Sequence, residues 1–300
     1  MTKPKFVLAG IFPPLTTPFA ADMSVDLAAL SSNVQKYNRV GLAGYVVVGS
    51  TGESVYLRED EKIRIWGTVR QATEGEKVLI AGTGCEATAE TIALTRRAAE
   101  LGYHVALVRT PAYFKPQMSD AALERHFLLV ADASPIPVLI YSVPQFTGLP
   151  VSAALVARLA QHSNIIGIKE SSGNVQLVAD IIGRVPASFQ VLVGSATTLY
   201  PSMALGACGA VLAVACALPE LCVELYQAAR SGEHERAREL QRRLHVPTVA
   251  LTSRFGIAGL KYAMDQRGYA GGPPRPPLLP LDQEARAEIT RIVGAATSSE

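Results

Sequence analysis

Eight short apolar segments, separated by amphipathic stretches, constrain the fold of this chain more than any other feature. They are Gly10–Leu15, Leu42–Val48, Lys77–Ala81, His104–Arg109, Pro137–Tyr141, Asn164–Lys169, Phe189–Val193 and Gly209–Ala213. Most contain continuous apolar runs such as YVVV and VLIY, which are typical of strands buried on both faces of a parallel sheet. Successive segments begin about 20 to 35 residues apart, as strand–helix units do in a barrel. We therefore predict an α/β fold, a (β/α)8 TIM barrel. The alternative is an open doubly wound sheet, but no GxGxxG motif follows the first segment.

The stretches between the apolar segments carry helix signals, and three more helical patterns follow the eighth unit. Residues able to cap a helix N-terminus precede three of the stretches: Asp26, Ser119 and Ser152. The later patterns are the shared face of Ala237, Leu240 and Leu244, then Phe255–Arg267 and Asp282–Val293. We therefore expect a barrel domain over residues 1–231 and a C-terminal helical extension over 232–300, with the run GGPPRPPLLP as a loop.

Composition excludes several classes of partner. The net charge is +2, only 18% of residues are charged, and there is no basic stripe, so we expect no nucleic-acid partner. No stretch approaches the roughly 18 apolar residues of a membrane helix, and the first ten residues lack the apolar run of a secretion signal. Cysteines and histidines fall in no metal-ligand spacing. We expect a cytoplasmic protein without a metal.

The residues that close the fifth and sixth apolar segments suggest imine chemistry. Catalytic groups of barrels sit where strands end, and there the sequence places Tyr141 and Lys169. Apolar surroundings destabilise the charged form of a lysine, and a neutral amine can attack a ketone to form an imine. A nearby phenol could pass the protons that this chemistry requires. The alternatives are a lysine that extends to solvent and a tyrosine that caps the core.

Three further strand ends carry polar groups. The second segment runs into GSTGE, where two glycines allow a tight turn whose N–H groups, with the hydroxyls of Ser50 and Thr51, could hold a carboxylate. An ordinary turn is the alternative, and Glu53 is expected to brace it. The fourth segment ends at Arg109, a possible carboxylate clamp, and Tyr113 follows, which could extend a hydroxyl relay or simply pack.

Taken together, the motifs GSTGE, YSVP and GIKESSGN resemble the dihydrodipicolinate synthase / N-acetylneuraminate lyase family of Schiff-base aldolases. The likeness runs from GIFPPLTTPF to GYAGGPPRPPL. Within the family, AGTGCEAT, YSVPQFTG, VLVGSAT and RFGIAGLK are most similar to the 4-hydroxy-2-oxoglutarate aldolases.

This resemblance implies roles for individual residues. Lys169 would be the imine lysine and Tyr141 the proton shuttle, aided by Thr51 and Tyr113, the latter reaching across a subunit interface. Substrate would be held by Ser50, Thr51, Ser171 and the backbone near Val211. The resemblance also implies a homo-oligomer, a tetramer or a dimer, and a covalent imine in place of any cofactor.

One position departs from the family pattern. Dihydrodipicolinate synthases usually carry an arginine two residues after the proline of the YxVP stretch, where it meets the carboxylate of the aldehyde partner. Here that position is Phe146, which cannot form a charge-assisted contact.

The predicted function is cleavage of 4-hydroxy-2-oxoglutarate to pyruvate and glyoxylate. One alternative is condensation of pyruvate with aspartate semialdehyde, which Phe146 disfavours, or with a neutral aldehyde. Others are a related 2-oxo acid aldolase or a dehydratase of a sugar-derived oxo acid, and a barrel that binds a 2-oxo acid without turnover.

Overall fold

The chain folds into a (β/α)8 barrel, as predicted. The computed structural model describes residues 6–298. All eight strands of the sheet are parallel, in the order β1-β8-β7-β6-β5-β4-β3-β2. The strands are β1 Gly10–Phe12, β2 Gly44–Val47, β3 Val78–Gly82, β4 Val105–Arg109, β5 Val138–Ser142, β6 Ile165–Glu170, β7 Gln190–Val193 and β8 Gly209–Val211.

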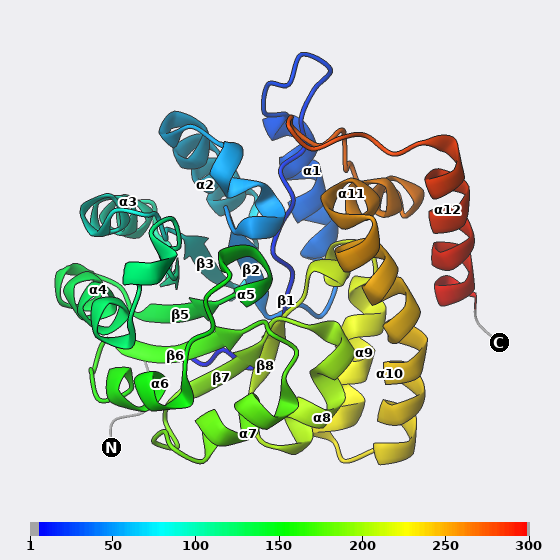
Figure 1. The fold of residues 1–300 in the computed structure, drawn as a ribbon. Helices are drawn as coiled ribbons and strands as arrows, with labels where there is room; N and C mark the ends of the chain where they lie inside the picture. Colours follow the sequence, from blue (N-terminus) through cyan, green and yellow to red (C-terminus); the bar gives the residue numbers. More distant parts are fainter. Residues whose placement is uncertain (1–5, 299–300) are drawn as a thin grey trace.

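A ring of helices surrounds the strands (Figure 1). Its members are α1 Leu27–Tyr37, α2 Glu59–Ala72, α3 Thr88–Glu100, α4 Asp120–Ala133, α6 Ala153–Leu159, α7 Val175–Ile182, α8 Leu199–Ala204 and α9 Pro219–Arg230. A short helix, α5 Pro144–Thr147, follows β5. The expected caps form, because Asp26, Ser119 and Ser152 each accept a hydrogen bond from a backbone N–H of the first helical turn.

The barrel closes between β1 and β2 through scattered hydrogen bonds. The Ala43 N–H donates to the Ile11 carbonyl at 3.0 Å, and the Val46 N–H donates to the Pro13 carbonyl at 3.1 Å. β1 is shorter than the predicted Gly10–Leu15 because Pro13 and Pro14 have no N–H for the ladder.

Alternation along the strands separates two cores. On β5, Leu139 and Tyr141 belong to the cluster inside the barrel, whereas Val138 and Ile140 belong to the larger cluster between strands and helices. Every second residue therefore points into the barrel, and the last inward residue of each strand lies at the same end.

Three helices follow α9, where the sequence predicts an extension. They are α10 His234–Thr248, α11 Gly256–Gln266 and α12 Gln283–Thr297, with a π-helical turn, Val249–Arg254, between the first two. α10 packs on α9 and α8, and α12 packs on α10 and α11. The segment between α11 and α12 passes the end of α1 (Figure 1), where the Asn33 amide donates to the Ala270 carbonyl. Within residues 6–298, no helix is both long and apolar enough to cross a membrane.

Candidate active site

The ends of β5 and β6 bring together the two residues predicted to carry the chemistry. Tyr141 and Lys169 are register partners on these adjacent strands, and both point into the barrel. The Lys169 Nζ lies 3.9 Å from the centroid of the Tyr141 ring. A phenol and an amine are therefore held side by side, as imine chemistry requires.

The Lys169 amine is buried but has no counter-ion. The residue is 5% exposed, and no carboxylate of the described chain lies within ion-pair distance of its nitrogen. The next residue, Glu170, faces the other side of β6 and is likewise buried. Burial raises the pKa of the Glu170 carboxyl, which accepts from the Ser172 N–H at 2.9 Å. Glu170 therefore lies apart from the amine, although the two are adjacent in sequence.

The loop after β2 supplies hydroxyl groups to the same place. A 3₁₀ turn, Ser50–Gly52, begins directly after the strand, and the Ser50 Oγ lies 3.3 Å from the Tyr141 hydroxyl oxygen. Thr51 lines the cavity above the barrel. The prediction assigned proton transfer to Thr51 and substrate binding to Ser50, but the hydrogen bond to the phenol comes from Ser50.

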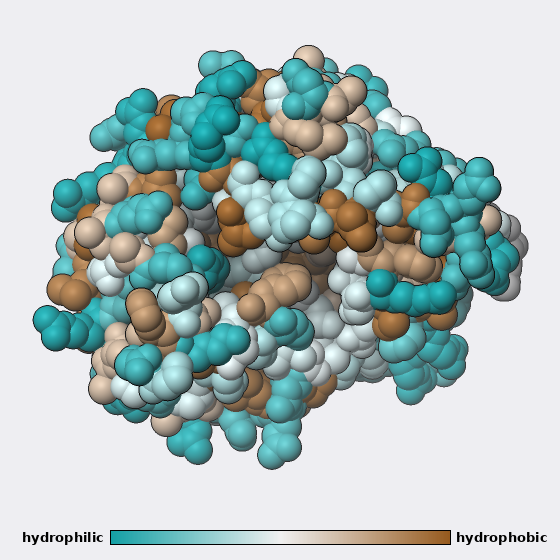
Figure 2. Space-filling model, turned by 45° about the horizontal axis from the view of Figure 1, so that its top comes forward, coloured by the Kyte–Doolittle hydropathy of each residue, from teal (hydrophilic) through white to brown (hydrophobic). Residues whose placement is uncertain are grey.

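A cavity of about 340 Å³ opens above Lys169 at the carboxyl ends of the strands. The face that Figure 2 turns toward the reader is hollowed near its centre, with hydrophobic side chains bordering the hollow. The cavity lining includes Thr51, Tyr141, Lys169, Ser171 and Val211. Of the described residues that line it, Lys169 alone carries a charged side chain.

One side of the cavity is formed by Gln145, Ser171 and Gly194. The Ser171 Oγ is buried and has no hydrogen-bond partner, while the Gln145 amide donates to the Ser171 carbonyl at 2.6 Å. Gly194 lies against Ser171, and a Cβ at Gly194 would sit 1.8 Å from the Ser171 Oγ. This close approach requires glycine at position 194 and places the serine hydroxyl against the Gly194 backbone.

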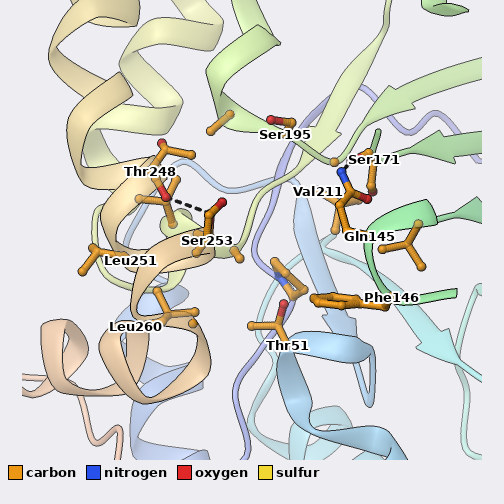
Figure 3. A pocket seen from close by; sticks show the side chains of 18 of the residues that line it. Thr51, Gln145, Phe146, Ser171, Ser195, Val211, Thr248, Leu251, Ser253 and Leu260 are labelled. Atoms are coloured by element: carbon orange, nitrogen blue, oxygen red, sulfur yellow. Dashed lines mark hydrogen bonds between the residues drawn. The ribbon is translucent and has the colours of Figure 1, made fainter. Parts of the chain in front are cut away.

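The opposite wall comes from the region that the sequence suggested was only an extension. Thr248, Leu251 and Ser253 line the cavity from the end of α10 and the π-helical turn (Figure 3). Sequence reasoning missed them, although Pro247 inside α10 was a signal. A proline removes a helix hydrogen bond, and π-helical turns are frequent at functional sites.

Phe146 stands at the entrance, where the family pattern has an arginine. Its ring lies between Thr51 and Gln145 in Figure 3, and the residue is 70% exposed. The part of the cavity farther from Lys169 is therefore bounded by a neutral ring and by hydroxyl and aliphatic groups.

Three predicted residues are not part of the cavity lining: Ser50, which contacts the lining residue Tyr141, and Tyr113 and Arg109. Tyr113 is 81% exposed and stacks edge-on against Phe114. Arg109 is directed to Glu86, with its Nη1 2.8 Å from the Glu86 Oε1. The other Glu86 oxygen accepts from the N–H groups of Ala112 and Tyr113, both at 2.8 Å. Arg109 is thus part of the support of the Tyr113 loop, and a role as a carboxylate clamp in this cavity does not fit its position.

Comparison with known proteins agrees with this arrangement. A profile of the dihydrodipicolinate synthetase family matches residues 7–296. A 4-hydroxy-tetrahydrodipicolinate synthase of Methanothrix thermoacetophila is 38% identical over 285 residues, covering 95% of each chain. A synthase of the same name from Exiguobacterium sp. is 35% identical over 283 residues, covering 94% of this chain and 96% of the other.

Solved structures give the same result. The dihydrodipicolinate synthase DapA-2 of Bacillus anthracis superimposes with a TM-score of 0.91 and 31% identity, covering 96% of this chain and 98% of that one. A prophage protein of Escherichia coli K12, solved in complex with pyruvate, gives 0.89 and 30% with the same coverage. The chain therefore belongs to the dihydrodipicolinate synthetase family, the pyruvate-dependent class I aldolases.

Proposed function

We propose that the protein is a Schiff-base lyase of pyruvate-derived 2-oxo acids, with 4-hydroxy-2-oxoglutarate as its substrate. The observation that carries the proposal is the Lys169 amine, unpaired and 3.9 Å from the centre of the Tyr141 ring, at the floor of a cavity. The pyruvate complex of the related Escherichia coli prophage protein supports a 2-oxo acid as ligand.

The reaction follows from the neighbours of the amine. Lys169 attacks the C2 ketone, and loss of water gives a protonated imine that accepts the electrons of the C3–C4 bond. Tyr141 removes the C4 hydroxyl proton while that bond breaks, and Ser50 shares a hydrogen bond with the phenol. Glyoxylate leaves, the enamine is protonated at C3, and water hydrolyses the imine to release pyruvate and the free lysine.

The substrate carboxylate next to the ketone would be held without a cation. Thr51 and the turn that follows β2 supply hydroxyl and N–H donors, and Ser171 lines the same cavity. In this scheme Val211 forms the apolar floor beside the imine. The imine performs the work of an electrophile, so the proposal includes no cofactor.

Borohydride reduction with pyruvate, read by intact mass, tests the proposal. A covalent adduct is expected on the wild type and not on Lys169→Ala. The matched control is Lys77→Ala, because Lys77 is a partly buried lysine that donates to the Leu42 carbonyl away from the cavity. No adduct on the wild type would leave only a binding function, and an adduct that persists in Lys169→Ala would place the imine on another lysine.

A second candidate concerns the aldehyde. Lys169 is the only Lys, Arg, His, Asp or Glu among the described lining residues, and Phe146 stands at the entrance. A neutral aldehyde is therefore favoured over one with a carboxylate, whether aspartate semialdehyde or glyoxylate. Steady-state rates with pyruvate and glyoxylate, glyceraldehyde or aspartate semialdehyde separate the candidates. A preference for glyceraldehyde would mean that 4-hydroxy-2-oxoglutarate is not the substrate. A preference for aspartate semialdehyde would contradict the reasoning from Phe146.

We further propose that the protein is a homo-oligomer in which Tyr113 completes the relay of a neighbouring subunit. Tyr113, Phe114 and Val55 are 81%, 65% and 68% exposed, and apolar surface of this kind is typical of interfaces. Light scattering of the purified protein would measure the subunit number. A monomer with full activity would exclude this role for Tyr113.

A further inference from the structure

A fully buried ion pair lies beneath the loop that carries the active-site hydroxyls. Glu53, directly after the Ser50–Gly52 turn, is 2% exposed, and Lys261 on α11 is 0% exposed. The Lys261 Nζ is 2.5 Å from the Glu53 Oε1 and donates to the Pro273 carbonyl at 2.9 Å. The pair therefore connects the loop after β2 to the C-terminal helices.

The segment after α11 holds the same carboxylate through a backbone amide. The Arg275 N–H donates to the Glu53 Oε2 at 2.8 Å. The Arg275 guanidinium donates to both Glu61 oxygens at 2.8 Å. The Phe19 ring lies against both cations, 4.4 Å from the Lys261 Nζ and 4.2 Å from the Arg275 Cζ. Each oxygen of Glu53 is thus fixed by a different part of the C-terminal chain.

The backbone of Glu53 explains why the loop requires such fixing. Its φ is 58°, in the left-handed region that non-glycine residues rarely adopt. Such a conformation persists where surrounding contacts impose it. The Glu53 N–H donates to the Ser50 carbonyl at 3.0 Å, and the Ser50 Oγ contacts the Tyr141 hydroxyl. A displacement of Glu53 would therefore reach the phenol through a single residue.

We infer that Glu53, Lys261 and Arg275 are positioning residues of the active site, which hold Ser50 and Thr51 against the phenol and the imine. The inference rests on the proposed function of Lys169. Buried ion pairs are directional contacts that contribute little net stability compared with apolar packing, so a role in geometry is the better account of this one. The helices after α9 then have two roles at the active site: they form one wall of the cavity, and they hold the loop that carries Ser50 and Thr51.

The test measures how fast pyruvate is trapped on the enzyme by cyanoborohydride, which needs no knowledge of the aldehyde. The principal variant is the double substitution Glu53→Gln with Lys261→Met, because it leaves no unpaired buried charge. Its melting temperature is expected close to that of the wild type. Trapping is expected to slow about ten- to a hundred-fold, as a displaced catalytic group does. A purely structural role would lower the melting temperature and leave the rate per folded molecule unchanged.

Coupling to Ser50 makes the test specific. If the pair acts through the loop, adding Ser50→Ala to the double variant should slow trapping little further, because interacting sites are not additive. The inference would be overturned if the effects of Ser50→Ala and of the double substitution on the trapping rate were fully additive. It would also be overturned if the folded double variant trapped pyruvate at the wild-type rate. Should the double variant not fold, Glu53→Asp keeps the charge but is one methylene shorter, so it cannot reach both the Lys261 amine and the Arg275 N–H. It is expected to trap several-fold more slowly, and an unchanged rate would overturn the inference equally.

The matched control is Arg158→Met, which removes a surface cation that pairs with Glu124 at 2.8 Å far from the loop. It is expected to trap pyruvate at the wild-type rate. Failure of the wild type itself to trap pyruvate would refute the proposed function and not this inference alone. Trapping by the wild type with unchanged rates in the folded variants would refute the inference and leave the function standing.

Discussion

Replacing Phe146 with arginine should raise the activity of the enzyme toward aspartate semialdehyde. The ring is 70% exposed at the entrance of the cavity, so the change removes little buried surface and should leave the fold intact. A hydrogen bond to a charged group contributes about 1.5–3 kcal/mol. Solvent at this exposed position screens the contact, which leaves about 1–2 kcal/mol. Since about 1.4 kcal/mol is tenfold, kcat/KM for aspartate semialdehyde should rise about 5- to 30-fold.

The assay compares kcat/KM for aspartate semialdehyde and glyceraldehyde, with pyruvate saturating, at low and high ionic strength. Phe146→Leu is the control, because it changes the shape of the entrance without adding charge. Phe146→Lys should gain less than arginine, because an ammonium cannot contact both carboxylate oxygens in a planar fork. The gain should shrink as salt is added. An equal gain in Phe146→Leu, or no gain in Phe146→Arg, would refute the idea that charge at this position selects the aldehyde.

Three further predictions follow from the described contacts. Tyr141→Phe should lower kcat about a hundred- to ten-thousand-fold with little change in the KM for pyruvate, because only the proton carrier is lost. If the phenol served only to pack the core, steady-state kinetics would show an unchanged kcat. Gly194→Ala should cost about 1–3 kcal/mol of unfolding free energy by overpacking, since its Cβ would meet Ser171, and Ser171→Gly in the same chain should restore it in urea denaturation. Burial lowers the pKa of His126 to about 4. As pH falls from about 6.5 to 4, this histidine therefore binds a proton in the unfolded chain before it does so in the folded protein. The free energy of unfolding should fall by about 3 kcal/mol across that window. His126→Gln should remove this part of the pH dependence, and equal slopes for variant and wild type would contradict the assignment.

The barrel could be predicted because its strands are buried on both faces. Continuous apolar runs such as those ending at Tyr141 and Lys169 mark such strands directly, and the spacing between runs leaves room for a helix each time. The ends of the strands were harder to predict. The strand β1, for example, stops at Phe12, because the two prolines that follow have no N–H to bond a neighbouring strand. The meeting of Tyr141 with Lys169 followed from their positions at adjacent strand ends, and the register pairs them.

The contribution of the C-terminal third could not be predicted in the same way. Thr248 and Ser253 reach the cavity because α10 runs back across the barrel end and gives way to a π-helical turn, and periodicity carries no information about where a helix packs. The bond of Glu53 with Lys261 joins residues more than two hundred positions apart. Glu53 was expected to brace its turn, and its carboxylate contacts Lys261 and the Arg275 N–H. Its partners, however, depend on tertiary packing that no local pattern encodes.

The contact between Arg275 and Glu53 also orders events during synthesis. A ribosome makes the loop of Ser50 and Thr51 more than two hundred residues before it makes Arg275. Domains begin to fold during translation, from the N-terminal end, so a nascent chain could assemble all eight strands before this loop acquires its anchors. Until Arg275 has been made, the lysine that we propose forms the imine would lack a properly held partner. A product that ends before Arg275 would be a barrel with little capacity to react with 2-oxo acids.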